Sequence, residues 1–287
     1  MIKKVAKTAI LQLTCPDRPR LVSELAGWVA NNGGNIFHSD HHTDHRAGIF
    51  LSRIEWGLEG FQLTRDAIYK EVKELAIRSN GKADLHFSDE KPRVAIFVSK
   101  QSHCLLDLLW RVRSGEILMD IPVIISNHRD LQNVCHEFEV DFKYIPNTPI
   151  DKGVSESLIL DVMLQYKVEL IVLAKYMQIL SPNFLKKFPN IINIHHSFLP
   201  AFKGSQPYHQ AWERGVKVIG ATAHYVTEDL DAGPIIDQQI TYVSHRDEVE
   251  DLIRKGRDSE RIALSRALRL HLCRQVIIYS GRTAVFA

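Results

Sequence analysis

The sequence predicts an α/β protein of two domains, a βαββαβ unit followed by a doubly wound, mostly parallel sheet. Two observations support this fold class. Before residue 90, apolar runs occur in the order strand, helix, two strands, helix and strand. Beyond that point, short apolar runs alternate with amphipathic segments, as expected when strands are buried on both faces of a parallel sheet.

The first predicted domain covers residues 1–89, and its element order is the ferredoxin-like layout. The turn at Pro16–Pro19 separates the first strand from the first helix. Asn31–Gly34 ends that helix, because Gly and Asn tolerate positive φ. The expected elements are strands over Lys7–Thr14, Asn35–His42, Gly48–Trp56 and Ala83–Phe87, and helices over Leu21–Ala30 and Thr64–Ser79.

The second predicted domain covers residues 90–287 and begins within the polar stretch Ser88–Pro92, which suits a linker. Its expected parallel strands are Val94–Ser99, Pro122–Ser126, Phe142–Ile145, Leu170–Ala174 and Ile191–His195, with helices over Leu105–Arg113, Leu131–Glu139 and Val154–Tyr166. The expected additions are a strand pair over Gly220–Val226 and Ile235–Val243, a charged helix over Arg246–Arg274 and a hairpin turning at Ser280–Gly281.

The composition is that of a globular protein, with 45% apolar and 24% charged residues. A net charge of +2 without a long basic run gives no indication of nucleic-acid binding. No apolar stretch is long enough to span a bilayer, and the first residues lack the apolar core of a signal peptide. The four cysteines are scattered without a CxxC pair, as expected for thiols in a reducing compartment. These features predict a cytoplasmic protein.

The most informative stretch, Asn193–Pro200, follows a predicted buried strand. Because side chains alternate along a strand, Asn193 and His195 share one face. Open α/β sheets bind ligands at the carboxyl ends of their strands. An amide can stabilise a developing oxyanion and an imidazole can move protons, so the pair suits acyl chemistry. The pattern leaves a second interpretation open, in which loop carbonyls hold a structural histidine.

A second polar stretch, His224–Pro234, begins in a predicted strand and ends in an acidic loop closed by Gly-Pro. A carboxylate in this loop can orient His195 and raise its basicity, or position a water molecule. For Glu228 and Asp229 the alternative is a solvated acidic turn.

Together, these two stretches resemble the folate-dependent formyltransferases. Asn193, His195 and Asp231 match the family's catalytic asparagine, histidine and aspartate, and His224 matches a supporting position. Leu173–Pro182 resembles the family's folate-binding segment. The resemblance implies a formyltransferase-like fold with no metal and no cofactor. It also implies folate contacts from Met177, Gln178, Ile179, Leu180, Thr227, Glu228 and Asp229.

The sequence of the segment Ser99–Leu109 distinguishes between the branches of this family. Transformylases that act on a phosphorylated amine resemble one another in a glycine-rich loop, whose N–H groups can approach a phosphate. Ser99–Leu109 contains no glycine, and Ser102 is expected to cap the following helix. This segment, together with HHSFLPAFKG at 195–204 and ERGVKVIGATAHYV at 213–226, resembles the deformylase branch.

The first domain resembles the ACT-type domain that precedes the hydrolase in formyltetrahydrofolate deformylases, through Thr14–Pro19 and Asp44–Arg46. The resemblance now spans nearly the whole chain. It implies hydrolysis of 10-formyltetrahydrofolate to formate and tetrahydrofolate, which supplies formate and balances the one-carbon folate pool for purine synthesis. It also implies a homo-oligomer, dimer or tetramer, and an amino-acid effector of unknown identity. Arg20 departs from the family, because ACT domains commonly carry glycine before the first helix.

Two other functions remain open. One is formyl transfer to an unphosphorylated amine by Asn193, His195 and Asp231. The other is a non-catalytic folate or amino-acid sensor, against which the intact catalytic set argues. For hydrolysis, the sequence leaves open whether Asp231 or His195 deprotonates the water.

Three further features have more than one interpretation. Lys175 is either a solvated charge or a contact for the glutamate tail of folate. His196 is expected to point away from His195 if the strand continues, because neighbouring side chains in a strand face opposite ways, and otherwise to be a loop residue or to support the catalytic residues. The cluster Asp40–His45 has the residue types of a metal site but no partner motif, so we expect no metal there.

Overall fold

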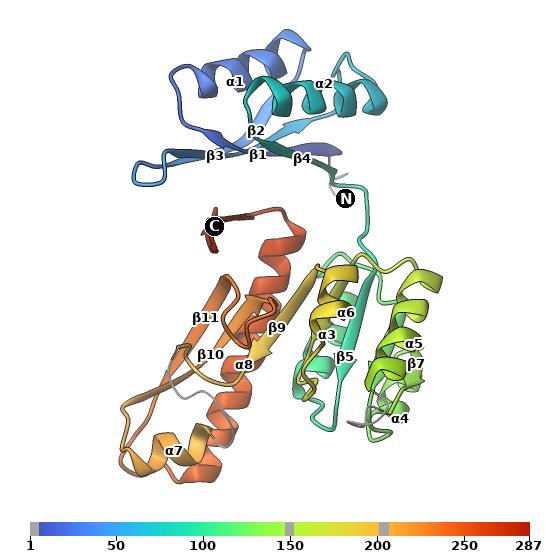
Figure 1. The fold of residues 1–287 in the computed structure, drawn as a ribbon, viewed down its shortest axis with the longest axis vertical. Helices are drawn as coiled ribbons and strands as arrows, with labels where there is room; N and C mark the ends of the chain where they lie inside the picture. The colour runs from blue at the N-terminus through green and yellow to red at the C-terminus, as the bar shows by residue number, and fades with distance from the viewer. Residues whose placement is uncertain (1–5, 147–151, 201–206) are drawn as a thin grey trace. The chain divides into compact units, whose positions relative to one another are not determined.

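The computed structural model describes residues 6–146, 152–200 and 207–287 (Figure 1). The described residues form two compact units. One contains the chain up to Lys91 together with Cys273–Ala287, and the other contains Pro92–Leu272. The sequence analysis placed the boundary two residues earlier and assigned the C-terminal tail to the second domain. That assignment of the tail was wrong.

The first unit has the expected ferredoxin-like layout. Its four-stranded antiparallel sheet has the strand order β2-β3-β1-β4, and both helices cover one face of it (Figure 1). Alternate strand residues face those helices and form an apolar core around the fully buried Trp56. The elements are β1 (Thr8–Pro16), α1 (Leu21–Asn31), β2 (Ile36–Asp44), β3 (Ile49–Gly57), α2 (Arg65–Arg78) and β4 (Lys82–Phe87).

The other face of this sheet binds the C-terminal hairpin, formed by β12 (Val276–Tyr279) and β13 (Arg282–Val285). Gln12 Nε2 donates hydrogen bonds to the carbonyl oxygens of Arg274 and Val276, each at 3.0 Å. The guanidinium of Arg53 donates to the carbonyl oxygens of Cys273 at 3.1 Å and Arg274 at 3.0 Å. Arg53 is only 5% exposed, and a buried guanidinium requires acceptors. Glu55 supplies one acceptor at 2.8 Å and the tail supplies two, which ties the tail to the first unit.

His86 of β4 faces the same side of the sheet. Burial lowers the pKa of its imidazole from 6.5 to about 4, and the positive charge of Arg274 contributes. The folded state therefore binds fewer protons than the unfolded state between these values, so stability is lost as the pH falls below about 6.5.

We expect this one group to reduce the free energy of unfolding by about 2 kcal/mol between pH 7 and pH 5. The substitution His86→Gln should remove that part of the pH dependence. Denaturant unfolding of both proteins at the two pH values measures it. An identical pH dependence in both proteins would show that His86 is not responsible.

The second unit contains the expected doubly wound sheet, with strand order β11-β10-β9-β8-β5-β6-β7. The strands from β7 to β9 in this order are parallel, and β10 is antiparallel to both of its neighbours. From the first strand, β5, the chain adds β6 and β7 on one side and then returns to add β8 and β9 on the other. The strands are β5 (Val94–Val98), β6 (Val123–Ser126), β7 (Asp141–Tyr144), β8 (Leu170–Leu173), β9 (Ile191–His195), β10 (Val218–Tyr225) and β11 (Ile235–Tyr242).

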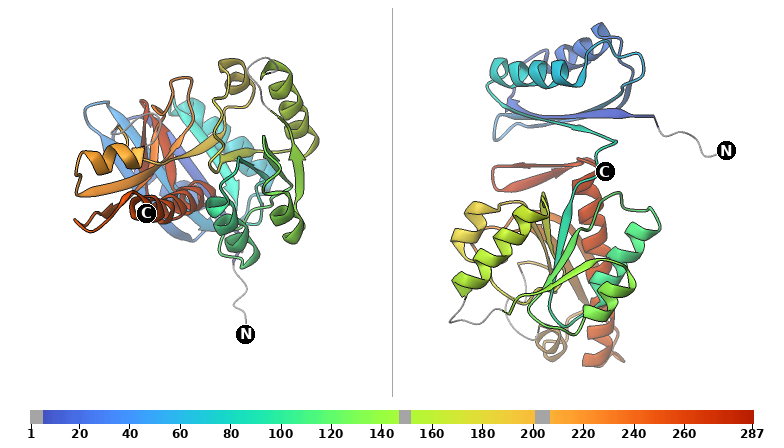
Figure 2. Two further views of the ribbon diagram at one scale, coloured as in Figure 1. Left: turned by 90° about the horizontal axis from the view of Figure 1, so that it is seen from below. Right: turned by 90° about the vertical axis from the view of Figure 1, so that its right-hand side faces the viewer.

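Helices cover both faces of this sheet (Figure 2). They are α3 (His103–Arg113), α4 (Gln132–Glu137), α5 (Lys152–Gln165), α6 (Pro182–Lys187), α7 (Pro207–Glu213) and α8 (Val249–Leu272). The sequence analysis did not identify α6 and α7, which are too short to show a clear apolar period. The Ser181-Pro182 pair was an available signal for α6, because Ser181 caps it and Pro182 occupies its first turn. Ser102 lies at the N-cap position of α3 but makes no side-chain capping bond, contrary to expectation.

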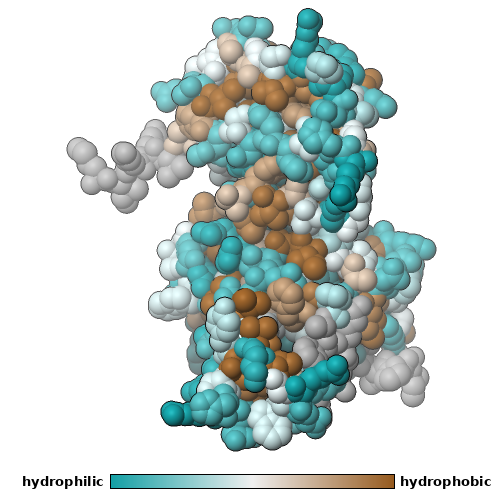
Figure 3. Space-filling model, turned by 90° about the vertical axis from the view of Figure 1, so that its left-hand side faces the viewer, coloured by the Kyte–Doolittle hydropathy of each residue, from teal (hydrophilic) through white to brown (hydrophobic). Residues whose placement is uncertain are grey.

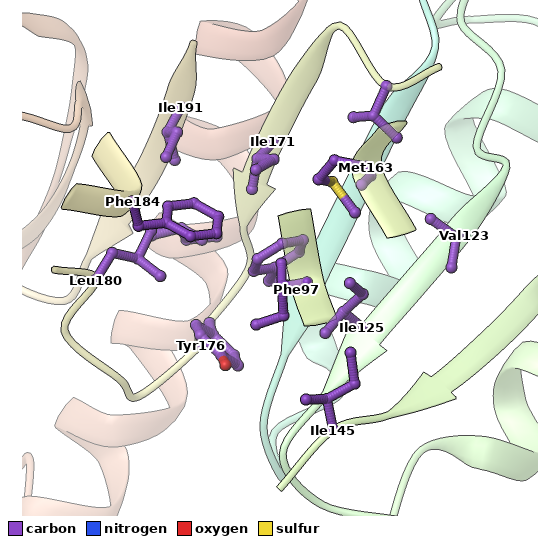
Figure 4. Close-up of a cluster of buried hydrophobic side chains, with 14 of the residues drawn as sticks. Phe97, Val123, Ile125, Ile145, Met163, Ile171, Tyr176, Leu180, Phe184 and Ile191 are labelled. Atoms are coloured by element: carbon purple, nitrogen blue, oxygen red, sulfur yellow. The ribbon is translucent and has the colours of Figure 1, made fainter. Parts of the chain in front are cut away.

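An apolar cluster fixes α5 and α6 against the parallel strands (Figure 4). Phe97 of β5 and Phe184 of α6 are fully buried in it, and Met163 of α5 fills the space beside them.

On the face shown in Figure 3, hydrophobic and hydrophilic residues are interspersed. Within the described residues, no helix combines the length and apolar character needed to cross a membrane.

Candidate active site

The three residues predicted to be catalytic come together at the carboxyl end of β9. Asn193 and His195 lie on this strand, and its antiparallel partner β10 places His224 opposite Asn193. Asp231 approaches from the loop that follows β10, and its Oδ2 lies 3.3 Å from Nδ1 of His195. Both side chains are largely buried, with exposed fractions of 8% for His195 and 15% for Asp231.

The hydrogen bonds of His224 define its tautomer and orient Asn193. Nδ1 of His224 lies 2.9 Å from the carbonyl oxygen of Tyr225, so Nδ1 carries the proton. Nε2 then accepts a hydrogen bond from Nδ2 of Asn193 at 3.2 Å. Burial lowers the pKa of His224, and this effect exceeds that of the hydrogen bond to Tyr225, which raises the pKa. The ring is therefore kept neutral. The second N–H of the Asn193 amide is left for a ligand oxygen.

His195 presents one ring nitrogen to a ligand. Its Nδ1 faces Asp231, whereas its buried Nε2 has no hydrogen-bond partner among the described residues. Buried polar atoms are nearly always paired, so an exception calls for a ligand or water at that position. Nε2 of His195 is therefore available to a ligand or a water molecule, as far as the described residues show.

The environment keeps Asp231 ionised. The hydrogen bond with His195 lowers the pKa of the Asp231 carboxyl, and this effect exceeds the opposing effect of burial. The second carboxylate oxygen, Oδ1, lies 3.7 Å from Nε2 of His224. An ionised Asp231 stabilises His195 when its ring gains a proton.

Backbone contacts of the loop between β10 and β11 hold Asp231 in place. Tyr225 N–H donates to the carbonyl oxygen of Pro234 at 2.9 Å, which closes the loop at its base. A Cβ at Gly233 would lie 1.8 Å from the carbonyl oxygen of Tyr225, so a larger residue cannot fit without moving backbone. Asp231 itself has a φ of 53°, a strained value for a residue other than glycine.

We expect Gly233→Ala to shift this loop and to lower turnover by about 100-fold, because a displacement near 1 Å can cost that much. Steady-state kinetics measure the effect, with Gly215→Ala as a control. At Gly215, a Cβ meets nothing within 4 Å, although this residue, unlike Gly233, has a positive φ of 62°. Equal turnover in the two variants would contradict this role for Gly233.

The predicted folate segment follows β8 and presents apolar side chains to solvent. Met177 and Ile179 are 60% and 61% exposed. Gln178 is partly buried, and Leu180 points into the apolar core instead. Ser99 Oγ accepts a hydrogen bond from Met177 N–H at 3.1 Å, which anchors the segment to the end of β5.

Three further predicted folate contacts lie in the loop that carries Asp231. Thr227, Glu228 and Asp229 are exposed. Thr227 Oγ1 donates to the carbonyl oxygen of Asp229 at 3.2 Å, and Glu228 lies 3.9 Å from Lys186 Nζ. Their side chains are thus accessible from solvent near the catalytic set.

His196 lies in the loop after β9, and Lys175 is not a solvated charge. The chain leaves β9 after His195, so the His196 ring stacks on that of His195, with centroids 4.8 Å apart and planes 19° apart. Lys175 is only 5% exposed and donates to His196 Nδ1 at 3.0 Å and to Glu260 Oε1 at 3.2 Å. The sequence analysis missed Glu260, because one acid in a charged helix carries no signal of its own.

Neither candidate metal cluster has a suitable donor set. Among the described residues, His103, Cys104 and Glu260 bring ligand atoms within 4.8 Å of one another. However, the ammonium of Lys175 already binds Glu260, and its charge opposes a second cation there. In the stretch Asp40–His45, both ring nitrogens of His41 bond to serine hydroxyls of Ser39 and Ser52.

The fold and site define a doubly wound enzyme domain for acyl chemistry, and comparisons with known proteins agree. Residues 92–268 match the Formyl transferase family. The chain is 54% identical over 280 residues to a formyltetrahydrofolate deformylase of Synechocystis, covering 98% of this chain and 99% of that protein. The crystal structure of a formyltetrahydrofolate deformylase from Pseudomonas syringae is 39% identical, with a TM-score of 0.97 over 100% of this chain and 96% of that one.

A more distant solved structure matches in part. Glycinamide ribonucleotide transformylase 1 from Symbiobacterium toebii is 32% identical, with a TM-score of 0.65 over 71% of this chain and 98% of that one. The chain belongs to the formyltetrahydrofolate deformylase family.

Proposed function

We propose that this protein hydrolyses 10-formyltetrahydrofolate to formate and tetrahydrofolate. Family membership supports the substrate and the reaction. The observation that carries the chemistry is the buried Nε2 of His195, which has no partner among the described residues and lies in a ring oriented by Asp231. It forms a proton-transfer site beside the amide of Asn193.

In the proposed mechanism, water adds to the formyl carbon. The remaining N–H of Asn193 donates to the formyl oxygen as that oxygen gains negative charge, and loss of such a donor typically costs about 10²–10³ in rate. The C–N bond to the folate nitrogen then breaks, and that nitrogen must be protonated to leave. These side chains supply oxyanion stabilisation and proton transfer, so the proposal includes no metal or cofactor.

We assign deprotonation of the water to His195. The lowered pKa of Asp231 makes its carboxylate a weak base. Nε2 of His195 can take a proton from water and deliver it to the folate nitrogen, while Asp231 stabilises the imidazolium in between. Asp231 also holds the ring in the required orientation.

For folate itself, we propose contacts along the segment from Met177 to Leu180 and from the loop residues Thr227 to Asp229. The exposed side chains of Met177 and Ile179 suit the face of a pterin ring, since exposed apolar groups beside a polar site often mark ligand contacts. Leu180 can take part through its backbone, because its side chain is buried in the core.

The purified protein should release one formate per 10-formyltetrahydrofolate consumed, without an added amine. Asp231→Asn should keep the fold and lower formate release by at least about 100-fold, since acid–base assistance is worth about 10²–10⁴. Formate assays and thermal unfolding measure both. Transfer of the formyl group to an amine in place of formate release would favour the transferase alternative. Normal turnover in a folded Asp231→Asn protein would remove Asp231 from the mechanism.

We further propose that the first unit regulates or assembles the enzyme, as an ACT-type domain in a cytoplasmic homo-oligomer that adjusts the folate pool for purine synthesis. Every proposed catalytic residue lies in the second unit. A cavity of about 450 Å³ between α1 and α2 is lined by charged groups of both signs, among them Arg18, Glu24 and Arg78. Such a lining suits the two charges of a small amino acid.

Addition of glycine or methionine to the full-length protein should therefore change formate release, provided the effector binds the active and inactive states with different affinities. Initial rates of formate release are measured against amino-acid concentration. Sedimentation gives the number of subunits with and without the amino acid. Arg78→Gln, which alters the cavity wall, should weaken the response. If neither amino acid changes the rate, regulation by these two ligands is excluded and assembly remains as the role.

A further inference from the structure

In the second unit, the side chains of Lys175, His103 and Glu260 meet at the carboxyl edge of the sheet. This point is the gap between β8 and β5, where the strand order reverses and where doubly wound sheets bind their ligands. Lys175 follows β8, and His103 begins the helix that follows β5. Glu260 reaches both of them from α8.

Glu260 is the centre of this group and is only 1% exposed. Its Oε1 accepts hydrogen bonds from Lys175 Nζ at 3.2 Å and from Tyr208 Oη at 3.0 Å. Its Oε2 lies 2.6 Å from Nε2 of His103. Lys175 donates a second bond to Nδ1 of His196 at 3.0 Å. We refer to these five residues as the Glu260 cluster.

The cluster contains a buried ion pair. Burial opposes ionisation of Glu260, but the hydrogen bond from His103 and the charge of Lys175 outweigh it and hold the pKa of Glu260 at about 2. Buried ion pairs contribute little net stability, because desolvation offsets their attraction. Stability alone therefore does not explain an ion pair in this gap.

Two features of the cluster are conformationally unfavourable. Lys175 has a φ of 65°, in the left-handed region that favours glycine. Tyr208 reaches Glu260 because residue 256, one turn earlier in α8, is glycine, and a Cβ there would lie 2.1 Å from the Tyr208 hydroxyl oxygen. Glycine inside a helix is unfavourable as well. Both features place side chains in the gap.

The cluster also contacts the catalytic histidine. The ring of His196 stacks on the ring of His195, so the cluster flanks His195 on one side. The exposed Met177 and Ile179, assigned to folate above, follow Lys175 in the chain. The formyl group is bonded to folate. The acceptor, water or an amine, therefore has to approach the formyl carbon from a side that the folate does not cover.

We propose, building on the proposed function, that the Glu260 cluster fills the acceptor side of His195 and restricts the acceptor to water. In hydrolysis, the water oxygen bonds to the formyl carbon, the C–N bond to folate breaks, and a proton moves to the folate nitrogen. In transfer, an amine nitrogen takes the place of water, the same bond breaks, and the amine proton moves to folate. An amine carries a substituent that needs space, and the side chain of Lys175 occupies it.

The fold itself permits either acceptor. The Symbiobacterium protein with the same fold is named a transformylase, so the choice between water and an amine depends on side chains and not on the arrangement of strands. Lys175 is the specificity residue in this proposal, and Glu260 is the positioning residue that holds it in place.

Product partition tests the proposal. The full-length protein and its variants are supplied with 10-formyltetrahydrofolate labelled with ¹³C in the formyl group, and with glycinamide as the amine. Nuclear magnetic resonance then gives the ratio of N-formylglycinamide to formate. The unaltered protein should give formate alone. Lys175→Gly, which relieves the unfavourable φ and opens the gap, should give a ratio at least tenfold above the detection limit, rising in proportion to glycinamide concentration. Lys175→Met, which keeps the volume without the charge, should give formate alone.

Lys167→Gly is the matched control, because Lys167 also has positive φ, at 50°, but is exposed. It should behave as the unaltered protein does. If Lys175→Gly fails to fold, the double variant Lys175→Gly/Glu260→Gln opens the same space without an unpaired carboxylate, and the same increase is expected. A folded, opened variant that gives formate alone overturns the proposal.

Two other results would also overturn it. Transfer by Lys175→Met would show that charge, not volume, excludes amines. Transfer by the unaltered protein would show that amines are not excluded at all. If the unaltered protein consumes no 10-formyltetrahydrofolate, the proposed function fails and this inference fails with it. An opened variant that still releases formate alone overturns only this inference and leaves the proposed function intact.

Discussion

The antiparallel pairing of β10 with β9 is the constraint on which the candidate active site depends. It places His224 opposite Asn193, and Thr222 opposite His195. Thr222 Oγ1 donates to the carbonyl oxygen of Ser197 and accepts from the N–H of Leu199, which fixes the chain just after His195. The tight return of the following loop then brings Asp231 to the imidazole. A single register therefore brings the amide and the imidazole of β9 together with a carboxylate from the loop after β10.

The carboxyl edge of the parallel sheet is divided into two regions of different character. Exposed apolar groups follow β8, the neighbour of the strand that carries His195, and an accessible acidic loop carries Asp231, an arrangement that suits a bound ligand. At the strand reversal between β8 and β5, an ion pair and its neighbours fill the edge instead. The side chains of Lys175, Glu260 and their partners therefore occupy the second region. In the proposed function, the first region is the substrate side of the sheet edge and the second is its closed side.

Arg20 and Lys175, which are not glycines, both adopt left-handed backbone conformations. Arg20, with a φ of 75°, lies where the ACT-type resemblance leads us to expect glycine, and Lys175 has a φ of 65° at the closed part of the sheet edge. In both places the backbone keeps a geometry that glycine adopts easily, while a long cationic side chain is present. At Lys175 the structure shows what that side chain does, since it pairs with Glu260.

The sequence by itself determined the order of the strands and long helices, because apolar periodicity is local. It also gave the candidate catalytic set Asn193, His195 and Asp231, because strand alternation and motif order are properties of short segments. It could not place the C-terminal tail, which joins the first unit through hydrogen bonds to Arg53 more than 200 residues away in the chain. Nor could it identify the partners of Lys175, since Glu260 is remote in sequence and reaches it only after α8 packs on the sheet. Local patterns carry secondary structure and motifs, whereas burial and long-range pairing exist only in the folded chain.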